Sequence, residues 1–330
     1  MTTPTGFYLH PSAALHDPGW RHPEHQGRLR AVSSKLGRVL PELGDRVVQG
    51  EPGEASEADL LRVHDSGLLE QMRDAVDRAR ESEKTVTLDA DTAVSGASWD
   101  AAVGSAGTAI AACREVAGGS VRNAFVATRP PGHHATPDRA MGFCLFNHVA
   151  VAARRLQADG LAERILVVDW DVHHGNGTQD IFYDDPSVFY LSLHQSPHYP
   201  GTGSAEERGA GEAEGTTLNV PLPPGTPRER YREAFDRGVE EVISTFSPDF
   251  LLVSSGFDVL AGDPLGGQLL EPEDLGEMTV QLREWSEEAF GGRMAVLLEG
   301  GYAPERLADG VAAVLRGLCG ADDLSGEDGV

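Results

Sequence analysis

Residues 164–177 hold the side chains of this chain that are best placed to do chemistry. An apolar run over residues 165–168 leads directly into Asp-Trp-Asp-Val-His-His, and a glycine follows at once. Such a run is typical of a strand buried on both faces of a parallel sheet. Asp171 and His173 are two residues apart, so in an extended chain both side chains would point the same way, as two ligands of one ion must.

Four further apolar segments also run into polar residues. They are residues 124–127, 187–193, 250–253 and 295–298. In a parallel sheet the carboxyl ends of the strands share one edge, and ligands bind outside that edge. The side chains that follow these segments are His133, His134, His194, Asp258 and Tyr302. We therefore expect them to gather near residues 171–173.

Asp171, His173 and Asp258 supply two carboxylates and one imidazole. This set of ligands suits Zn²⁺ or Fe²⁺ and leaves a fourth position for water, which is the arrangement of a catalytic site and not of a structural one. A metal held in this way lowers the pKa of its water towards ~7 and polarises a carbonyl oxygen. The sequence therefore predicts a metal-assisted hydrolytic site.

Two other motifs complete this prediction. His133 and His134, in a turn with two prolines and a glycine, can act as general base and general acid. The hydroxyl of Tyr302, which follows two glycines, can donate to a developing oxyanion. Taken singly, a pair of histidines is usually structural and a Gly-Gly-Tyr segment is usually a turn. Their position after different parallel strands favours a catalytic role for these residues.

The N-terminal segment contains four histidines within sixteen residues: His10, His16, His22 and His25. Their spacing matches no compact metal site, and prolines and glycines lie between them. We interpret residues 22–24 as a fixed loop near a pocket. In the acidic loop over residues 88–92, Asp89 and Asp91 either cap the next helix, lie at the rim of a pocket or form an ordinary charged turn.

Helical patterns separate the apolar segments. They cover residues 26–39, 58–80 in two short helices, 99–116, 146–158, 228–245, 272–290 and 304–318. The alternation predicts an α/β fold with a mainly parallel β-sheet and helices on both faces. Because no linker separates the segments, we expect one domain over residues 1–320. The acidic residues 321–330 are predicted to form a flexible tail.

The composition limits the partners. The 330 residues include 52 acidic and 27 basic ones, for a formal net charge of −25. This charge argues against direct nucleic-acid binding and favours a cationic substrate. Only Lys35 and Lys84 are lysines; adaptation to a high-salt cytoplasm and a GC-rich genome explain this equally well.

The compartment is predicted to be the cytoplasm. Cys113, Cys144 and Cys319 are scattered, which indicates neither disulfides nor a thiolate zinc site and fits a reducing environment. No stretch of about 18 apolar residues predicts a membrane span, and the N-terminus lacks the pattern of a secretory signal. The oligomeric state stays open, a homo-oligomer included.

Several motifs together resemble the histone deacetylase superfamily, including its bacterial and archaeal amidohydrolases and acetylpolyamine amidohydrolases. They are Arg-Pro-Pro-Gly-His-His at 129–134, Asp-Trp-Asp-Val-His-His-Gly-Asn-Gly at 169–177, Gly-Phe-Asp at 256–258 and Glu-Gly-Gly-Tyr at 299–302. His-Pro-Glu at 22–24 and Met-Gly-Phe-Cys at 141–144 extend the resemblance over nearly the whole chain. Trp170, Asn176 and Phe257 are similar to the class II branch.

The resemblance implies an arginase/deacetylase-like domain and a zinc-dependent hydrolase that removes acetyl groups from amines. Its metal ligands would be Asp171, His173 and Asp258. His133 and His134 would flank the water, and Tyr302 would polarise the acetyl carbonyl. Asp169 would orient the ring of His133. Asn176 stands beside His134 where many relatives have an aspartate, and a neutral amide stabilises a protonated ring less.

The resemblance also implies a structural monovalent cation, K⁺, near the active site. The positions that match its ligands are Asp169, Asp171, His173, Ser192 and Leu193. The related arginases hold two manganese ions, but the positions of their additional carboxylates are occupied here by Gly175 and Leu260. We therefore expect one catalytic metal and no ureohydrolase activity.

The substrate is predicted from the channel positions of relatives. Gly142, Phe143 and Tyr199 match residues that wall a narrow channel around an acyl-lysine stem. Leu265 stands where acetylpolyamine-selective relatives can have a glutamate. We therefore expect acetylated lysine in a protein or peptide as the substrate, with an acetylated polyamine as the alternative. A non-catalytic acyl-lysine binder is disfavoured because Tyr302 is present.

Overall fold

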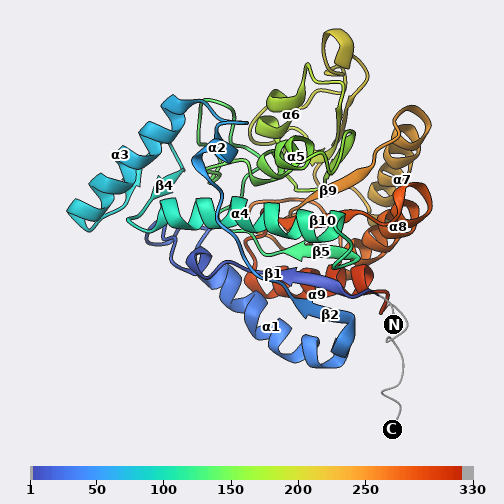
Figure 1. Cartoon of the computed structure of the whole chain (residues 1–330), viewed down its shortest axis with the longest axis horizontal. Helices are drawn as coiled ribbons and strands as arrows, with labels where there is room; N and C mark the ends of the chain where they lie inside the picture. The colour runs from blue at the N-terminus through green and yellow to red at the C-terminus, as the bar shows by residue number, and fades with distance from the viewer. Residues whose placement is uncertain (1–2, 322–330) are drawn as a thin grey trace.

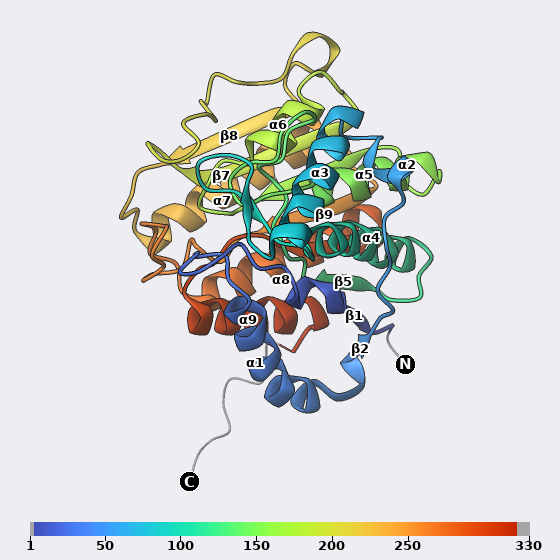
Figure 2. The same ribbon diagram turned by 90° about the vertical axis from the view of Figure 1, so that its left-hand side faces the viewer.

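A computed structural model describes residues 3–321 of the chain. Its centre is a parallel sheet of eight strands in the order β2-β1-β5-β10-β9-β6-β7-β8. The strands are β1 (Thr5–Tyr8), β2 (Val47–Gln49), β5 (Asn123–Val126), β6 (Ile165–Asp169), β7 (Val188–Gln195), β8 (Thr217–Leu222), β9 (Phe250–Ser255) and β10 (Met294–Leu298). Figure 2 shows β7 and β8 at one edge and β1 and β2 at the other. The predicted parallel sheet is confirmed.

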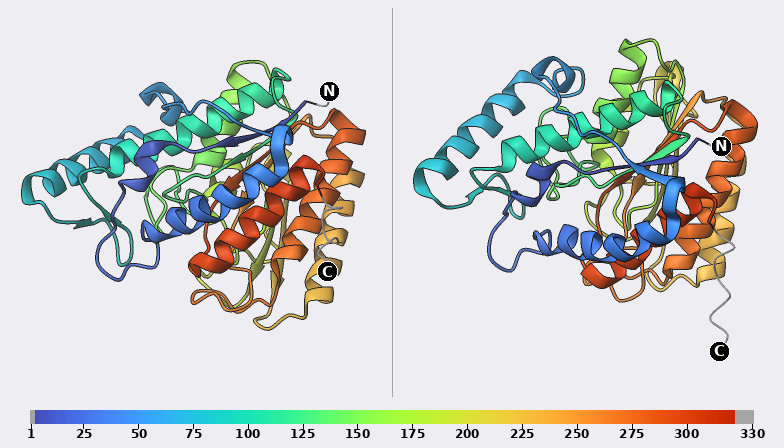
Figure 3. Two further views of the ribbon diagram at one scale, coloured as in Figure 1. Left: turned by 90° about the horizontal axis from the view of Figure 1, so that it is seen from below. Right: turned by 60° about the horizontal axis from the view of Figure 1, so that its bottom comes forward.

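Helices cover both faces of the sheet, as predicted. The helices are α1 (Gly27–Leu43), α2 (Glu57–Leu60), α3 (Ser66–Ser82), α4 (Ser98–Ala117), α5 (His148–Ala158), α6 (Asn176–Phe182), α7 (Arg228–Thr245), α8 (Pro272–Phe290) and α9 (Pro304–Cys319). Figures 1 and 3 show α4 on one face of the sheet and α1 and α9 on the other. Each face has its own apolar core, because the strands are buried on both sides.

The core residues follow from the periodicity of the sequence. The apolar stripe predicted for α1 consists of Leu29, Val32, Leu36, Val39 and Leu40; the first four are buried, and Leu40 is half-buried. Helix α4 is built from small residues and packs closely: a Cβ at Gly107 would lie 2.2 Å from the backbone of residues 54 and 55. Within the described part of the chain, none of the helices has the length and apolar character needed to cross a bilayer.

Some elements were missed or misplaced by the sequence analysis. Strand β2 and the antiparallel pair β3 (Val86–Thr87) and β4 (Ala93–Val94) were not predicted, because each has only two or three residues. Helix α6 begins directly after Gly175, where only a turn was expected. The predicted tail is described only at Ala321; residues 322–330 lie outside the described part.

Strand β6 ends at Asp169, before the two predicted ligands. The alternation expected of an extended chain therefore does not orient Asp171 and His173. A turn does so instead: the backbone N–H of His173 donates to Asp171 Oδ1 over 2.9 Å. The two side chains converge because a carboxylate caps its own turn.

Candidate active site

A pocket of about 490 Å³ opens beyond the carboxyl ends of the strands. Among the residues that line it are His134, Gly142, Phe143, His173, Tyr199, Leu265 and Tyr302. These residues come from five different loops of the chain, and the sheet brings them together. The four positions predicted to form a substrate channel, Gly142, Phe143, Tyr199 and Leu265, therefore all reach one cavity.

Asp171, His173 and Asp258 form a buried cluster at this pocket. Each offers a ligand atom, and these atoms lie within 4.8 Å of one another. His173 Nδ1 is 3.0 Å from Asp171 Oδ1 and 3.3 Å from Asp258 Oδ2. Burial, and then the negative charge of Asp171, raise the pKa of Asp258 to about 7. Two carboxylates buried side by side disfavour each other's ionisation, and a cation between them removes this cost.

The hydrogen bonds and the close backbone around Asp171 and Asp258 also fit a metal site. Asp258 Oδ2 is buried and accepts no hydrogen bond among the described residues. The backbone comes close: Gly300 N–H donates to Asp171 Oδ2 over 2.9 Å. A Cβ at Gly300 would lie 2.1 Å from Asp258 Oδ2, so only glycine fits there. These three side chains therefore fit a divalent cation such as Zn²⁺ or Fe²⁺.

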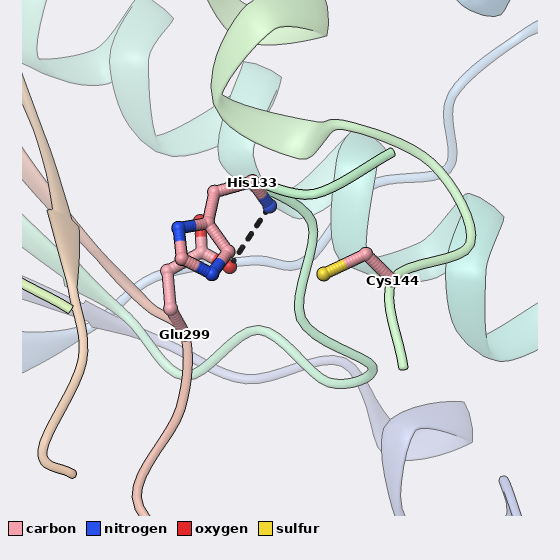
Figure 4. A group of neighbouring side chains, drawn as sticks. All are labelled: His133, Cys144 and Glu299. Atoms are coloured by element: carbon pink, nitrogen blue, oxygen red, sulfur yellow. Dashed lines mark hydrogen bonds between the residues drawn. The ribbon is translucent and has the colours of Figure 1, made fainter. Parts of the chain in front are cut away.

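A second group, His133, Cys144 and Glu299, also has the geometric spacing of metal ligands. Figure 4 shows the Glu299 carboxylate against His133, with the Cys144 sulfur facing them. However, Glu299 Oε2 already accepts from the backbone N–H groups of Gly132 and His133, at 2.7 and 3.3 Å, and Oε1 accepts from Ser254. Burial and the charge of Glu299 raise the pKa of the Cys144 thiol well above 9.0. Glu299 thus fixes the turn that carries the histidines, and this group is a poor metal site.

The two adjacent histidines have different partners. His133 Nδ1 lies 3.0 Å from Asp169 Oδ2, and His134 Nδ1 lies 2.9 Å from Asn176 Oδ1. Burial alone would lower the pKa of His133, but Asp169 and Asp171 outweigh it and raise this pKa to about 10. Burial, and then the neighbouring rings of His133 and His173, lower the pKa of His134 well below 6.5. The pair is therefore asymmetric, with the proton held on His133.

Tyr302 lies at the pocket between a cation and an aromatic ring. The Arg28 guanidinium stands 5.0 Å from the centroid of the Tyr302 ring, and the Phe143 ring meets it edge to face at 5.7 Å. Arg28 also donates to the carbonyls of Glu299 and Gly301, over 2.5 and 2.6 Å. Arg28 thus holds two backbone carbonyls, those of Glu299 and Gly301, in the glycine turn that precedes the tyrosine.

The N-terminal loop does reach the pocket, as expected for residues 22–24. The His22 ring lies 4.5 Å from the Phe143 ring, and His22 Nε2 donates to the Asp91 carbonyl over 2.9 Å. Asp91 lines the mouth of the pocket. Glu24 is fully buried and forms ion pairs with Arg28 and Arg129, at 2.9 and 2.7 Å. Sequence reasoning missed this cluster because its members are far apart in the chain.

The positions predicted for a monovalent cation lie at or just after the end of β6 and on the neighbouring strand β7. Asp169 in β6 is the direct partner of Ser192 in β7, and both are fully buried. His194, at the end of the same strand β7, points elsewhere: its ring contacts Ser192 Oγ and the Gly203 carbonyl. His194 therefore supports a loop and does not join the cluster around His173.

His198 and Asp263 were not predicted, yet both contact the site. The His198 ring stacks on His173 at 4.8 Å between centroids, and its Nε2 donates to the Leu265 carbonyl over 2.8 Å. The Asp263 carboxylate accepts from the backbone of Tyr302 over 2.6 Å. The only signal for His198 was its place beside Tyr199, and for Asp263 its place five residues after Asp258.

Comparison with known proteins agrees with this geometry. The family model of the histone deacetylase domain matches residues 22–318. A probable deacetylase of Archaeoglobus fulgidus is 39% identical over 301 residues, covering 91% of this chain and 82% of the relative. A histone deacetylase-like amidohydrolase of Pseudomonas aeruginosa is 39% identical over 321 residues, covering 97% of this chain and 81% of the relative.

A solved structure of a related protein has the same fold. The crystal structure of the HDA15 HD domain superposes with a TM-score of 0.90 at 38% sequence identity, covering 97% of this chain and 89% of that one. The relatives carry the names deacetylase and amidohydrolase, which describe hydrolases of amide bonds. The chain therefore belongs to the histone deacetylase family and is a deacetylase.

Proposed function

We propose that this chain is a zinc-dependent deacetylase that hydrolyses the acetyl amide of acetyl-lysine side chains in proteins or peptides. The observation that carries the proposal is the buried cluster of Asp171, His173 and Asp258 at a pocket that His134 and Tyr302 also line. Zn²⁺ is the metal expected from these ligands, and Fe²⁺ suits them as well. When bound, the metal would activate water and polarise the acetyl carbonyl.

The histidine pair divides the proton transfers. Asn176 Oδ1 accepts from His134 Nδ1, so the free lone pair of His134 is on Nε2. Because its pKa is held low, His134 is neutral at pH 7 and can take the proton of the attacking water. His133, kept protonated by Asp169, can give a proton to the leaving amine. Hydrolysis then yields acetate and a free amine.

We expect the pKa of His133 to stay above that of His134 when a metal is bound. A divalent cation would lower the pKa of both rings. Only His133 has a buried carboxylate as its direct partner, since His134 faces a neutral amide. His134 therefore remains the weaker base, the neutral member of the pair and the acceptor of the first proton.

Tyr302 would donate its hydroxyl to the oxygen of the acetyl group as negative charge develops there. Burial raises the pKa of Tyr302 well above 10.0, helped by Asp258 and Asp171 and opposed by the positive charge of Arg28, so that the phenol keeps its proton. A donor that stays protonated at all working pH values is what this role requires. K⁺ at Asp169, Asp171, His173, Ser192 and Leu193 is part of the proposal and would be structural.

The walls of the pocket favour acetyl-lysine as substrate. Phe143 and Tyr199 both line the cavity together with Gly142, and aromatic faces suit an aliphatic stem. Leu265 at the pocket is apolar, so it offers no charge to the distant ammonium of a polyamine. The net charge of −25 and Asp91 at the mouth favour any cationic substrate, which keeps acetylpolyamines as the second candidate.

One experiment separates the two substrate classes. We expect kcat/KM, on the same zinc-loaded preparation, to be at least about tenfold higher for an acetyl-lysine peptide than for N-acetylputrescine, a difference of ~1.4 kcal/mol. The Tyr302→Phe variant is the control and should lose about 10²–10³ in kcat on both. A ratio in favour of N-acetylputrescine would assign the chain to small amines. Full activity of Tyr302→Phe would refute the mechanism.

We also propose a compartment and partners for the protein. Cys113 and Cys144 are free and buried, as suits a cytoplasmic protein in a reducing environment. The proposed partners are acetylated proteins or peptides, without nucleic acid or membrane. A non-catalytic acyl-lysine binder would require the loss of a group such as Tyr302, which this chain has.

A further inference from the structure

Asp263 lies beside the pocket, and all of its polar contacts are with backbone N–H groups around that pocket. Its side chain is only 7% exposed. Oδ2 accepts from Tyr302 N–H over 2.6 Å and from Ala303 N–H over 3.1 Å. Oδ1 accepts from Leu265 N–H over 2.9 Å. One carboxylate therefore joins the residue proposed to polarise the carbonyl to a residue that lines the pocket.

The loop that carries Asp263 is itself held in place. The loop begins after the proposed metal ligand Asp258. A bridge between Leu260 and Leu270 closes its base, and Ala261 N–H donates to the Leu270 carbonyl over 2.8 Å. Arg306 in α9 donates to the Ala261 carbonyl over 3.2 Å. The carboxylate is thus presented from a fixed base and not from a free loop.

Tyr302 needs such an anchor because of the residues before it. Gly300 and Gly301 precede it, and Gly301 has φ +119. Because glycines have no side chain, they do not by themselves fix the backbone direction that leads to Tyr302. Arg28 holds the carbonyls on the N-terminal side of this turn. On the C-terminal side, the N–H groups of Tyr302 and Ala303 are held by Asp263 alone among the side chains described.

Through Leu265, the Asp263 carboxylate is also connected to the proposed metal ligand His173. Leu265 lines the pocket, and its carbonyl accepts from His198, whose ring stacks on His173. A continuous path of hydrogen bonds and ring contact therefore leads from Tyr302 through Asp263 and Leu265 to His198 and His173. The loop fixes the distance between the proposed hydroxyl donor and the proposed ligand.

We propose that Asp263 is a positioning residue for the reaction: it places the Tyr302 hydroxyl over the proposed metal ligands and couples that placement to the pocket wall at Leu265. This inference rests on the proposed role of Tyr302. It requires a carboxylate, because both oxygens accept from N–H groups. An asparagine has one acceptor oxygen, and its NH₂ group would face an N–H donor on whichever side it lies.

The test compares Asp263→Asn with a matched control. Asp274, at the start of α8, is also a buried aspartate, 5% exposed, that accepts a backbone N–H, that of Glu271, over 2.8 Å. It does not line the pocket. We expect Asp263→Asn to lower kcat about 10–100-fold, because small misplacement of a reacting group has effects of this size. The bound zinc and the affinity for acetyl-lysine peptide should change little. Asp274→Asn should lose stability and keep its kcat.

A double-mutant cycle with Tyr302→Phe shows whether Asp263 acts through the hydroxyl. We expect Asp263→Asn to have no further effect on kcat in the Tyr302→Phe background. Asp263→Glu, which keeps two acceptor oxygens at a shifted position, should fall between the wild type and Asp263→Asn. Amide hydrogen exchange in residues 299–303 should rise in Asp263→Asn and stay unchanged in Asp274→Asn.

Three results would overturn the proposal. They are an unchanged kcat in Asp263→Asn, an equal loss of kcat in Asp274→Asn, and a loss in the Tyr302→Phe background as large as in the wild type. The Tyr302→Phe variant alone reports on the proposed function. If its kcat were normal, the role of Tyr302 would be refuted directly, whatever Asp263→Asn does.

Discussion

His133 and His134 are neighbours in the chain, yet they differ in the partner that each ring has. A carboxylate faces one and an amide faces the other, at nearly the same distance. The carboxylate raises the pKa of His133, while burial and nearby positive charge lower that of His134. The neutral amide of Asn176 brings no negative charge to His134, so burial and the neighbouring rings keep the pKa of His134 low.

Changing Asn176 to Asp is predicted to raise the pKa of His134, because a carboxylate stabilises the protonated ring. His134 must be neutral to accept the proton of water. The fall of kcat/KM on the acidic side of the pH profile should therefore move to higher pH in Asn176→Asp, by about one unit. The measurement is kcat/KM against pH on zinc-loaded protein.

The control for this prediction is Gln179→Glu, in the same helix α6. Gln179 contacts His174 and not His134, at 3.0 Å between Gln179 Oε1 and His174 Nε2. Gln179 Nε2 donates to Glu207 Oε2 over 2.6 Å, so the new carboxylate faces Glu207 and leaves the partner of His134 unchanged. The pH profile of Gln179→Glu should therefore shift much less. Equal shifts in the two variants would mean that general charge and not the ring's partner controls the profile.

At the scale of elements, the site is built by contacts between loops that follow different strands. The Glu24 cluster is the clearest case, because it joins α1 and the N-terminal loop to the turn after β5 and the turn of Tyr302. Burial alone would raise the pKa of Glu24, but Arg129 and Arg28 outweigh burial and lower it below 4.5. Glu24 is therefore ionised and stabilises the fold above its unfolded pKa.

Glu24→Gln is predicted to lower the free energy of unfolding at pH 7 by about 3–5 kcal/mol, because it leaves two buried guanidinium groups without their carboxylate. The contribution of Glu24 is lost as the pH falls through its lowered folded pKa, so the difference between variant and wild type should narrow in strong acid. Urea denaturation at several pH values measures both effects.

Glu57→Gln provides the comparison. Glu57 pairs with Arg73 on the surface, where both side chains are about half exposed. Such a pair contributes about 0–1 kcal/mol. Losses of equal size in Glu57→Gln and Glu24→Gln would show that the buried cluster has no special part in stability.

At the scale of the whole molecule, the sequence predicted what depends on periodicity. The parallel sheet and the helices on both faces follow from apolar runs and 3.6-residue patterns, and the structure confirms them. Most of the polar residues expected at one edge of the sheet do gather there, but His194 does not join them. The convergence of Asp171 and His173 was predicted from an extended chain, but a turn after β6 produces it.

The features that sequence could not predict depend on contacts between distant parts of the chain. Glu24 meets Arg129 across 105 residues, and Asp263 meets Tyr302 across 39. No local pattern marks such pairs, because neither partner changes the periodicity of its own segment. Short elements such as β2 were missed for the related reason that three residues show no period.

We propose that Asp171, His173 and Asp258 hold a single catalytic metal, and that His133, Cys144 and Glu299 do not. The most direct test is to titrate Zn²⁺ into chelator-stripped protein and to follow bound zinc together with deacetylation of an acetyl-lysine peptide. Two variants accompany the wild type: Asp258→Asn removes a ligand from the first cluster, and Cys144→Ser removes one from the second.

We predict that one equivalent of zinc restores full activity in the wild type and in Cys144→Ser. Asp258→Asn should bind zinc at least about 100-fold more weakly, since it lacks one of three ligands. Stoichiometric zinc binding that survives in Asp258→Asn and is lost in Cys144→Ser would show that the second cluster, and not the first, holds the metal.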